Sequence, residues 1–258
     1  MPGFSVVITD LTYYPSVLSS KPVLENISLR VNAGEFVAVV GLNGAGKSSL
    51  LRAMAGEISP SIGEVRVGGQ LVSQPINRVI DRVGVVHQFD SPDLIEHLTV
   101  GQNIAVRQVL GGGHPNHVFA AGTKWSRNIA TRLAAEAKLE DYDLNELILN
   151  LNGGRRQILS VAIAVHLEHH ENPCQLLLLD EHTARLDHKN AVRVMDYTAA
   201  QAMASGATVV MVTHRYPDAL SFATRLLVMR DGRVNADLRR DQFPTPDNLV
   251  KMVEANDS

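Results

Sequence analysis

The chain has 258 residues, of which 45% are apolar and 20% are charged, so it can bury a substantial core and is neither disordered nor fibrous. Its 24 Lys and Arg against 27 Asp and Glu leave a formal net charge of -3, which excludes a global positive field for nonspecific binding to nucleic acid or membranes. A single cysteine, Cys174, excludes an intramolecular disulfide and a multi-cysteine zinc site and favours a reducing compartment.

Hydrophobic runs and the N-terminus bear on cellular location. No apolar run approaches the roughly 18 to 20 residues that cross a bilayer. The first ten residues lack a basic start followed by an apolar block, so we expect no secretory signal. These features predict a cytoplasmic chain that does not span a membrane by itself.

The first third of the chain predicts an antiparallel β portion and then a buried strand. Phe4–Ile8 and Ile27–Val31 alternate as half-buried strands do. Phe36–Val40 is instead apolar on both faces, as a strand inside a parallel sheet must be. A helix is expected from about residue 47 to 55, with Gly56 as its stop.

The rest of the chain predicts a parallel α/β core with an insertion. Residues 63–72 alternate again and can rejoin the β portion, whereas about 92–150 has helical spacing and is predicted to be mostly helical. Gln175–Leu179 and Ala207–Val212 are two further fully apolar strands, each followed by polar residues. Because ligands of parallel sheets bind beyond the carboxyl ends of the strands, we expect the site there.

A glycine-rich turn follows the first buried strand and matches the pattern G-x-x-x-x-G-K-[ST]. Glycines let successive backbone N–H groups wrap phosphates, and the following helix start adds a partial positive charge. The lysine reaches the β- and γ-phosphates, and the hydroxyl after it offers an oxygen to Mg²⁺. The predicted nucleotide-binding residues are Gly41, Asn43, Gly44, Ala45, Gly46, Lys47, Ser48 and Ser49.

Acidic residues and a histidine end the two later buried strands. Asp180 is placed to hold Mg²⁺, directly or through water, and Glu181 to accept a proton from, or orient, the water that attacks the γ-phosphate. His214 closes the last strand and would reach the same sheet edge as Lys47. A structural histidine is the alternative for His214 on its own, and the shared edge favours a catalytic role.

The segment Leu151–Gln157 reads Leu-Asn-Gly-Gly-Arg-Arg-Gln and precedes an apolar helical run. Its capping residue and two glycines at a helix start form a second anion site, suited to a γ-phosphate offered by another subunit. With the phosphate loop, the strand carboxylates and His214, it resembles the signature of ATP-binding cassette (ABC) ATPases over nearly the whole chain. The resemblance implies an α/β P-loop NTPase fold, with a RecA-like parallel sheet, an N-terminal antiparallel β subdomain and an α-helical insertion.

The resemblance implies one ATPase domain over the whole sequence. Its expected parts are an antiparallel β portion at about 1–35 and 63–75, an ATP-binding core at about 36–62, 76–91 and 158–258, and a helical insertion at about 92–157 that ends in the signature.

Further site residues follow from the resemblance alone. Gln88 resembles the Q-loop glutamine that touches Mg²⁺ or its water, and Asp187 resembles the D-loop residue that crosses a dimer interface. Tyr14, or less favourably Tyr13, resembles the aromatic residue that stacks on adenine, with strand packing as the alternative. The implied cofactors are ATP and Mg²⁺, with Ser48, Gln88 and Asp180 as the metal-site residues and with Asn152, Gly153 and Gly154 as signature residues that contact nucleotide.

Two residues depart from the family signature. Asn152 stands where the family has Ser and can still donate to a phosphate oxygen. Arg155 stands where the family has Gln and is expected to bring a permanent charge close to the nucleotide. Both departures bear on turnover rather than on nucleotide binding.

The function that the resemblance implies is the ATPase subunit of a membrane transporter, with import expected. The implied partners are a second cassette, as a homodimer or a pair, an integral membrane permease and, through it, an extracytoplasmic substrate-binding protein, with no nucleic acid. The expected location is the cytoplasmic face of the cell membrane. An apolar docking surface for the permease is expected from some of Phe89, Leu94, Ile95, Leu98 and Val100, although these residues could instead pack the insertion's own core.

Two alternatives belong to other classes of protein. A soluble ABC ATPase of the iron-sulfur assembly type has the same catalytic set and would be separated by its gene neighbours. A phosphate-loop kinase or small GTPase leaves Leu151–Gln157 unexplained. Within the ABC family, the run from Leu179 to Asp187 is similar to ATPases of uptake systems described as aromatic amino acid type.

Overall fold

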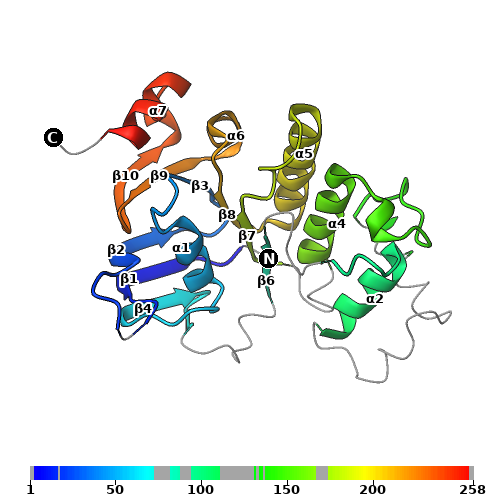
Figure 1. The fold of residues 1–258 in the computed structure, drawn as a ribbon, viewed down its shortest axis with the longest axis horizontal. Coiled ribbons are helices and arrows are strands. Elements are labelled where there is room, and N and C mark those ends of the chain that lie inside the picture. Colours follow the sequence, from blue (N-terminus) through cyan, green and yellow to red (C-terminus); the bar gives the residue numbers. More distant parts are fainter. Residues whose placement is uncertain are drawn as a thin grey trace.

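Two β-sheets and the helices that pack on them make up the chain, which we describe from a computed structural model (Figure 1). The structure describes residues 3–16, 18–72, 82–87, 94–110, 131, 134–135, 137–166 and 174–255. In these ranges the strands are β1 (Val6–Tyr13), β2 (Leu24–Val31), β3 (Phe36–Val40), β4 (Ile62–Val67), β5 (Gln70–Leu71), β6 (Val83–Val86), β7 (Leu176–Asp180), β8 (Thr208–Val212), β9 (Arg225–Arg230) and β10 (Arg233–Arg239). The α-helices are α1 (Lys47–Met54), α2 (Val100–Leu110), α4 (Gly153–His166), α5 (His188–Ser205), α6 (Tyr216–Phe222) and α7 (Pro246–Glu254), and Ile148–Asn150 and Arg240–Gln242 form 3₁₀ turns.

The larger sheet has six strands in the order β10-β9-β3-β8-β7-β6. Its strands pair in parallel except β10, which pairs antiparallel with β9 at the edge. The side chains of Val37–Val40 and Leu176–Leu179 are fully buried, because helices or the second sheet cover both faces. The apolar runs in the sequence therefore predicted these central strands correctly, and the α/β fold is confirmed.

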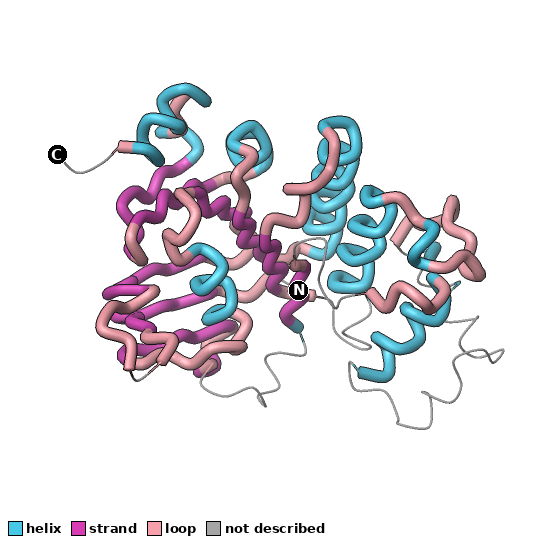
Figure 2. The backbone as a smooth tube through the Cα atoms, in the orientation of Figure 1, coloured by secondary structure: helices cyan, strands magenta, loops and turns pink. Residues whose placement is uncertain are grey.

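The smaller sheet is antiparallel, with the order β2-β1-β4-β5. Figure 2 shows both sheets in magenta, the smaller one at lower left and the larger one running from upper left to the centre. One core cluster contains side chains of β1, β2, β4 and α1 together with residues of β3, β7 and β8. Helix α1 is therefore packed between the two sheets, which fixes the phosphate loop that precedes it.

The opposite face of the larger sheet is covered by α4, α5, α6 and α7, whose apolar side chains form a second cluster. Helix α4 is apolar around most of its circumference, and Ile158–Val165 are all buried. Leu159 and Ile163 face a third cluster with α2, whereas Val161 and Val165 face the sheet. Helix α4 thus connects the insertion to the ATP-binding core. None of the helices in the described ranges is long and apolar enough to cross a membrane.

The described part of the insertion is less helical than its sequence pattern predicts. Helix α2 is its longest helix, and residues 94–99 and 137–147 form turns and a short bridge. Side chains replace helical hydrogen bonds there: the Asn103 amide bonds both the N–H and the carbonyl of Ile95, and Asp143 Oδ1 accepts from the N–H of Asn145. The expectation of a mostly helical segment is therefore wrong for these residues.

Candidate functional site

The phosphate loop lies between the end of β3 and the start of α1. Gly46 takes the N-cap position in the left-handed conformation, with φ 93°. A Cβ atom on Gly46 would lie 2.7 Å from the carbonyl oxygen of Val23, so the position requires glycine both for its backbone conformation and for space. The loop therefore presents backbone N–H groups at a helix start, the arrangement that binds phosphates.

Lys47 folds back onto this loop. Its Nζ donates to the carbonyl oxygens of Gly41 and Leu42 at 3.0 and 2.9 Å, and the side chain is 5% exposed. Burial lowers the pKa of Lys47, while the nearby carboxylates of Glu181 and Asp180 act in the opposite direction. The loop thus holds a buried positive charge beside two acidic groups.

Asp180 ends β7 and faces Ser48 at the start of α1. The Ser48 hydroxyl donates to Asp180 Oδ1 at 3.0 Å. Burial raises the pKa of Asp180, although the hydrogen bond from Ser48 lowers it. Hydroxyl and carboxylate oxygens are the ligands that Mg²⁺ prefers, so this pair fits a Mg²⁺ ion held together with nucleotide phosphates.

Glu181 and His214 meet at the ends of neighbouring strands. His214 Nε2 lies 2.8 Å from Glu181 Oε1, without the angles of a hydrogen bond. Glu181 has φ 50°, the left-handed region that non-glycine residues rarely adopt, and its N–H donates to the carbonyl of Val212 at 3.0 Å. The left-handed backbone of Glu181 therefore coincides with a partly exposed carboxylate that lies beside His214.

The signature segment caps helix α4. Asn152 Oδ1 accepts from the N–H of Arg155 at 3.0 Å, and no described residue pairs with its Nδ2. The exposed Asn152 therefore caps its own helix with one end of the amide and keeps two N–H donors for a ligand. Gly154 packs so closely on Asn190 that a Cβ would lie 2.8 Å from Asn190 Oδ1.

Asp187 caps helix α5 next to the signature. Its carboxylate accepts from the backbone N–H and from Nδ2 of Asn190, at 3.0 and 2.6 Å. These bonds, the backbone one first, lower the pKa of Asp187, which stays exposed. Since Asn190 also touches Gly154, one residue connects the predicted D-loop to the signature helix.

Arg155 is engaged within its own chain. Its guanidinium stacks over the Tyr142 ring at 4.4 Å, donates to the carbonyl of Asp141 and lies 3.6 Å from Glu146. The Tyr142 hydroxyl in turn donates to the carbonyl of Arg155 at 2.8 Å. These contacts direct the charge toward the insertion, and the expected effect of Arg155 on a nucleotide stays a prediction.

The remaining predicted residues have mixed outcomes. Gln88 lies outside the described residues. The carbonyl of its neighbour His87 accepts a hydrogen bond from Gln157 Nε2 at 3.4 Å, which joins helix α4 to the end of β6. The sequence pattern did not predict this contact. Tyr13 packs against the core beneath the smaller sheet, whereas half-exposed Tyr14 is outside that cluster, which favours Tyr14 for adenine. Of the other loop residues, Asn43 and Gly44 are exposed, Ala45 is buried and Ser49 is half-buried.

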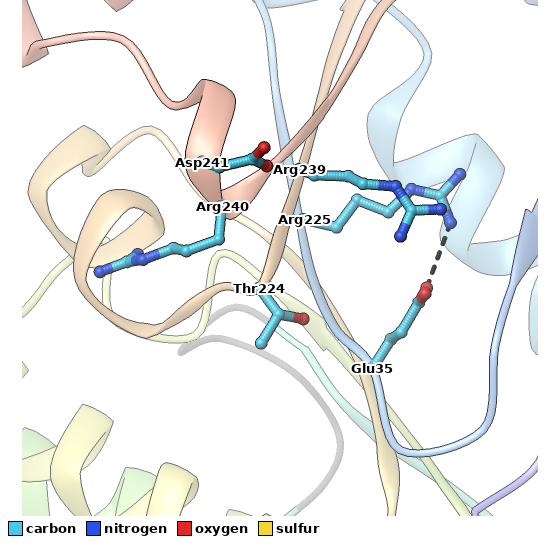
Figure 3. A pocket seen from close by; sticks show the side chains of 6 residues that line it. All are labelled: Glu35, Thr224, Arg225, Arg239, Arg240 and Asp241. Carbon is cyan, nitrogen blue, oxygen red and sulfur yellow. Dashed lines mark hydrogen bonds and ion pairs between the residues drawn. The ribbon is translucent and has the colours of Figure 1, made fainter.

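A separate pocket of about 540 Å³ opens at the amino-terminal ends of β3 and β9 (Figure 3). Two of its arginines are engaged: Arg225 pairs with Glu35 and Asp237, and Arg240 donates to the carbonyl of Ala223. Figure 3 shows Arg240 pointing away from Arg225. None of the predicted site residues lines this pocket, which consists of Glu35, Thr224, Arg225, Arg239, Arg240 and Asp241.

The predicted site residues therefore lie in two groups. Lys47, Ser48, Asp180, Glu181 and His214 gather at the carboxyl edge of β3, β7 and β8. Asn152, Gly153, Gly154 and Asp187 form the second group, at the starts of α4 and α5. In Figure 1, α1 and α4 lie on either side of the region of β6 and β7, so one chain keeps its two anion sites apart.

Comparisons with known proteins show what this chain is similar to. A family model described as ABC transporter matches residues 24–184. A hemin import ATP-binding protein of Methylobacillus flagellatus is 33% identical over 241 residues, which cover 92% of this chain and 84% of that protein. A Nod factor export ATP-binding protein of Rhizobium johnstonii is 31% identical, with 92% of this chain and 71% of that protein covered. A solved dimeric ATP-binding cassette in a post-hydrolysis state, bound to ADP and Pi, superposes with a TM-score of 0.73 and 25% identity over 92% of this chain and 100% of that one.

Proposed function

This chain belongs to the ABC transporter family and is an ATP-binding and ATP-hydrolysing cassette of that family, and from this premise we propose that it powers a separate membrane permease. Relatives named as ATP-binding proteins of import and export systems support the transport role. We propose import as the direction, which the 33% identity to the hemin import protein supports. An extracytoplasmic binding protein would then deliver the substrate, and the chain would work on the cytoplasmic face of the membrane.

We propose that two copies close over two ATP molecules, each between Lys47 of one chain and Asn152–Gly154 of the other. The observation that carries this is the separation of two anion sites on one chain. A single cassette does not bring its own signature onto its own phosphate loop, whereas a two-fold dimer does so twice. The dimeric form of the solved cassette with ADP and Pi supports this arrangement.

In the proposed mechanism the phosphate loop and Lys47 bind the phosphates of ATP, and Tyr14 stacks on the adenine. Glu181 accepts a proton from the attacking water or orients that water, and His214, whose Nε2 lies 2.8 Å from the Glu181 carboxylate, approaches the γ-phosphate. Ser48, Asp180 and Gln88 would hold Mg²⁺, which neutralises charge on the phosphates. Water attacks phosphorus, the bond to the bridging oxygen breaks, and ADP and phosphate leave.

The apolar residues that the structure leaves exposed on the insertion differ in part from the set expected from the sequence. Val100 is fully buried and Leu94 packs against the insertion's core, so neither is available, and Phe89 lies outside the described residues. Ile95 and Leu149 are 45% and 43% exposed. Their segments are neighbours, because the N–H of Leu149 donates to the carbonyl of Glu96 at 3.2 Å.

We therefore propose Ile95 and Leu149 as the apolar anchors of the permease contact. The test is co-expression with the permease encoded next to this chain, followed by purification of the membrane complex. Ile95→Glu should abolish co-purification and leave ATP binding intact, and Val192→Glu, at an exposed position of α5, is the control that should keep both. A wild-type chain that instead co-purifies with cytosolic iron-sulfur scaffold proteins would contradict the transport role.

A further inference from the structure

His182 follows the proposed catalytic Glu181 and turns in the opposite direction, into the protein. Its side chain is 2% exposed. No described residue bonds its Nδ1. A buried ring nitrogen without a partner destabilises the fold, and an apolar side chain of similar volume would avoid that cost. Packing alone therefore does not account for a histidine here.

The other ring nitrogen faces helix α5. His182 Nε2 lies 3.5 Å from Oγ1 of Thr198, which is completely buried. The single hydroxyl proton of Thr198 is already donated to the carbonyl of Val194 at 2.8 Å, so the Thr198 oxygen can only accept. The imidazole must then carry its proton on Nε2 and donate it to Thr198. At 3.5 Å the contact is at the long end of hydrogen-bond distances.

The position of this contact in the chain connects it to the reaction. Glu181 has φ 50°, and the turn after it is closed by the N–H of Ala184, which donates to the carbonyl of Glu181 at 2.9 Å. The same segment continues to Asp187, which caps helix α5. His182 is one side chain that anchors this segment to α5, because Thr198 lies on that helix, and Asp187 is another.

We infer that His182 is a positioning residue, which holds Glu181 in its left-handed conformation by donating from Nε2 to Thr198. This inference rests on the proposed role of Glu181 as the residue that acts on water. A strained backbone persists only where its surroundings determine it. Without the anchor, Glu181 relaxes toward an ordinary conformation and its carboxylate moves away from the attacking water, whereas the phosphate loop keeps its shape.

The test is steady-state ATP hydrolysis by the full chain carrying His182→Leu, His182→Gln or Thr198→Val. Leucine fills the space without a donor, glutamine can place an N–H near the Nε2 position, and valine removes the acceptor at constant volume. We expect His182→Leu and Thr198→Val each to lower kcat about tenfold or more with KM for ATP within about twofold. His182→Gln should keep more than about half of kcat, and the Leu and Val changes together should be no worse than one alone.

Thr208→Val is the matched control, since Thr208 is buried and bonds the carbonyl of Phe4 at the far end of β8. It should lower the melting temperature without lowering kcat. Normal turnover in both His182→Leu and Thr198→Val would overturn the inference, and so would an equal loss in His182→Gln and His182→Leu. Glu181→Gln in the same assay separates the two proposals. If Glu181→Gln is inactive while His182→Leu keeps the wild-type kcat, only the positioning role of His182 is wrong. If Glu181→Gln keeps the wild-type kcat, the proposed role of Glu181 is wrong.

Discussion

Replacing Arg155 with Gln restores the residue usual in the family signature and tests what the arginine does here. The Arg155 side chain is 25% exposed, and its guanidinium stacks on the Tyr142 ring at 4.4 Å. Such a contact stabilises the fold by about 1 kcal/mol. The charged hydrogen bond to the carbonyl of Asp141 adds about 1 kcal/mol, and the pair with Glu146 at 3.6 Å less than about 0.5 kcal/mol. We therefore expect Arg155→Gln to destabilise the fold by about 2 kcal/mol.

For a chain of this length, that loss corresponds to a fall in melting temperature of roughly 4 to 8 °C. Thermal unfolding without nucleotide is the assay, and Arg155→Lys is the matched variant, because it keeps the charge and loses the planar stack and the fork of donors. It should lose most of the same stability. An unchanged melting temperature for Arg155→Gln, together with a shifted salt dependence of ATP-driven dimerisation, would refute the reasoning and place the charge at the nucleotide.

Three further predictions concern the site and its surroundings. Lys47→Ala should weaken ATP binding about tenfold or more, because the lysine binds the phosphates of ground-state ATP. Glu181→Gln should keep the Kd for ATP within about threefold and lower kcat about a hundredfold, because the glutamate acts on water. Equal effects of the two variants on Kd would contradict these roles. Asp180→Asn should remove most of the difference in ATP affinity measured with and without Mg²⁺, and an unchanged difference would place the ion elsewhere. Burial raises the pKa of Tyr142 to about 12, so the unfolded chain loses this proton first and stability should fall by up to about 3 kcal/mol as pH rises from 10 to 12. When the free energy of unfolding is measured by urea titration between pH 10 and 12, it should fall less steeply with pH in Tyr142→Phe than in the wild type. An equal pH dependence in the two proteins would argue against the burial of Tyr142 as the cause of the fall.

Local patterns predicted the elements that a short stretch of sequence determines. The strand Phe36–Val40 is recognisable because a strand buried on both faces has no polar position, and the phosphate loop because its glycines follow such a strand directly. Asp180, His214 and Lys47 are predicted to share one edge because parallel strands end there together, and Asp180 lies close enough to Lys47 to act on its pKa. Each of these inferences needs only residue order and sheet geometry.

Contacts that depend on how distant segments pack could not be predicted in this way. Val100 was expected among exposed docking residues, yet its N–H donates to the carbonyl of Glu146 and its side chain is buried where α2 begins. Leu149, an exposed residue on the neighbouring segment, carries no sequence signal of its own. The stacking of Arg155 on Tyr142 requires the turn before the signature to fold back on α4, which periodicity does not encode. The contact of His182 with Thr198 depends likewise on how α5 packs beside the end of β7.

The pairing of two chains across ATP is the central claim, and light scattering of Glu181→Gln with ATP and Mg²⁺ tests it most directly. That variant should bind nucleotide and not consume it, so the closed state accumulates. We expect the mass to double with ATP and Mg²⁺ and to stay that of one chain with ADP, and the doubling to be lost when Asn152→Asp places a negative charge beside the γ-phosphate. A variant that binds ATP with Mg²⁺ to saturation and remains a single chain would contradict the account.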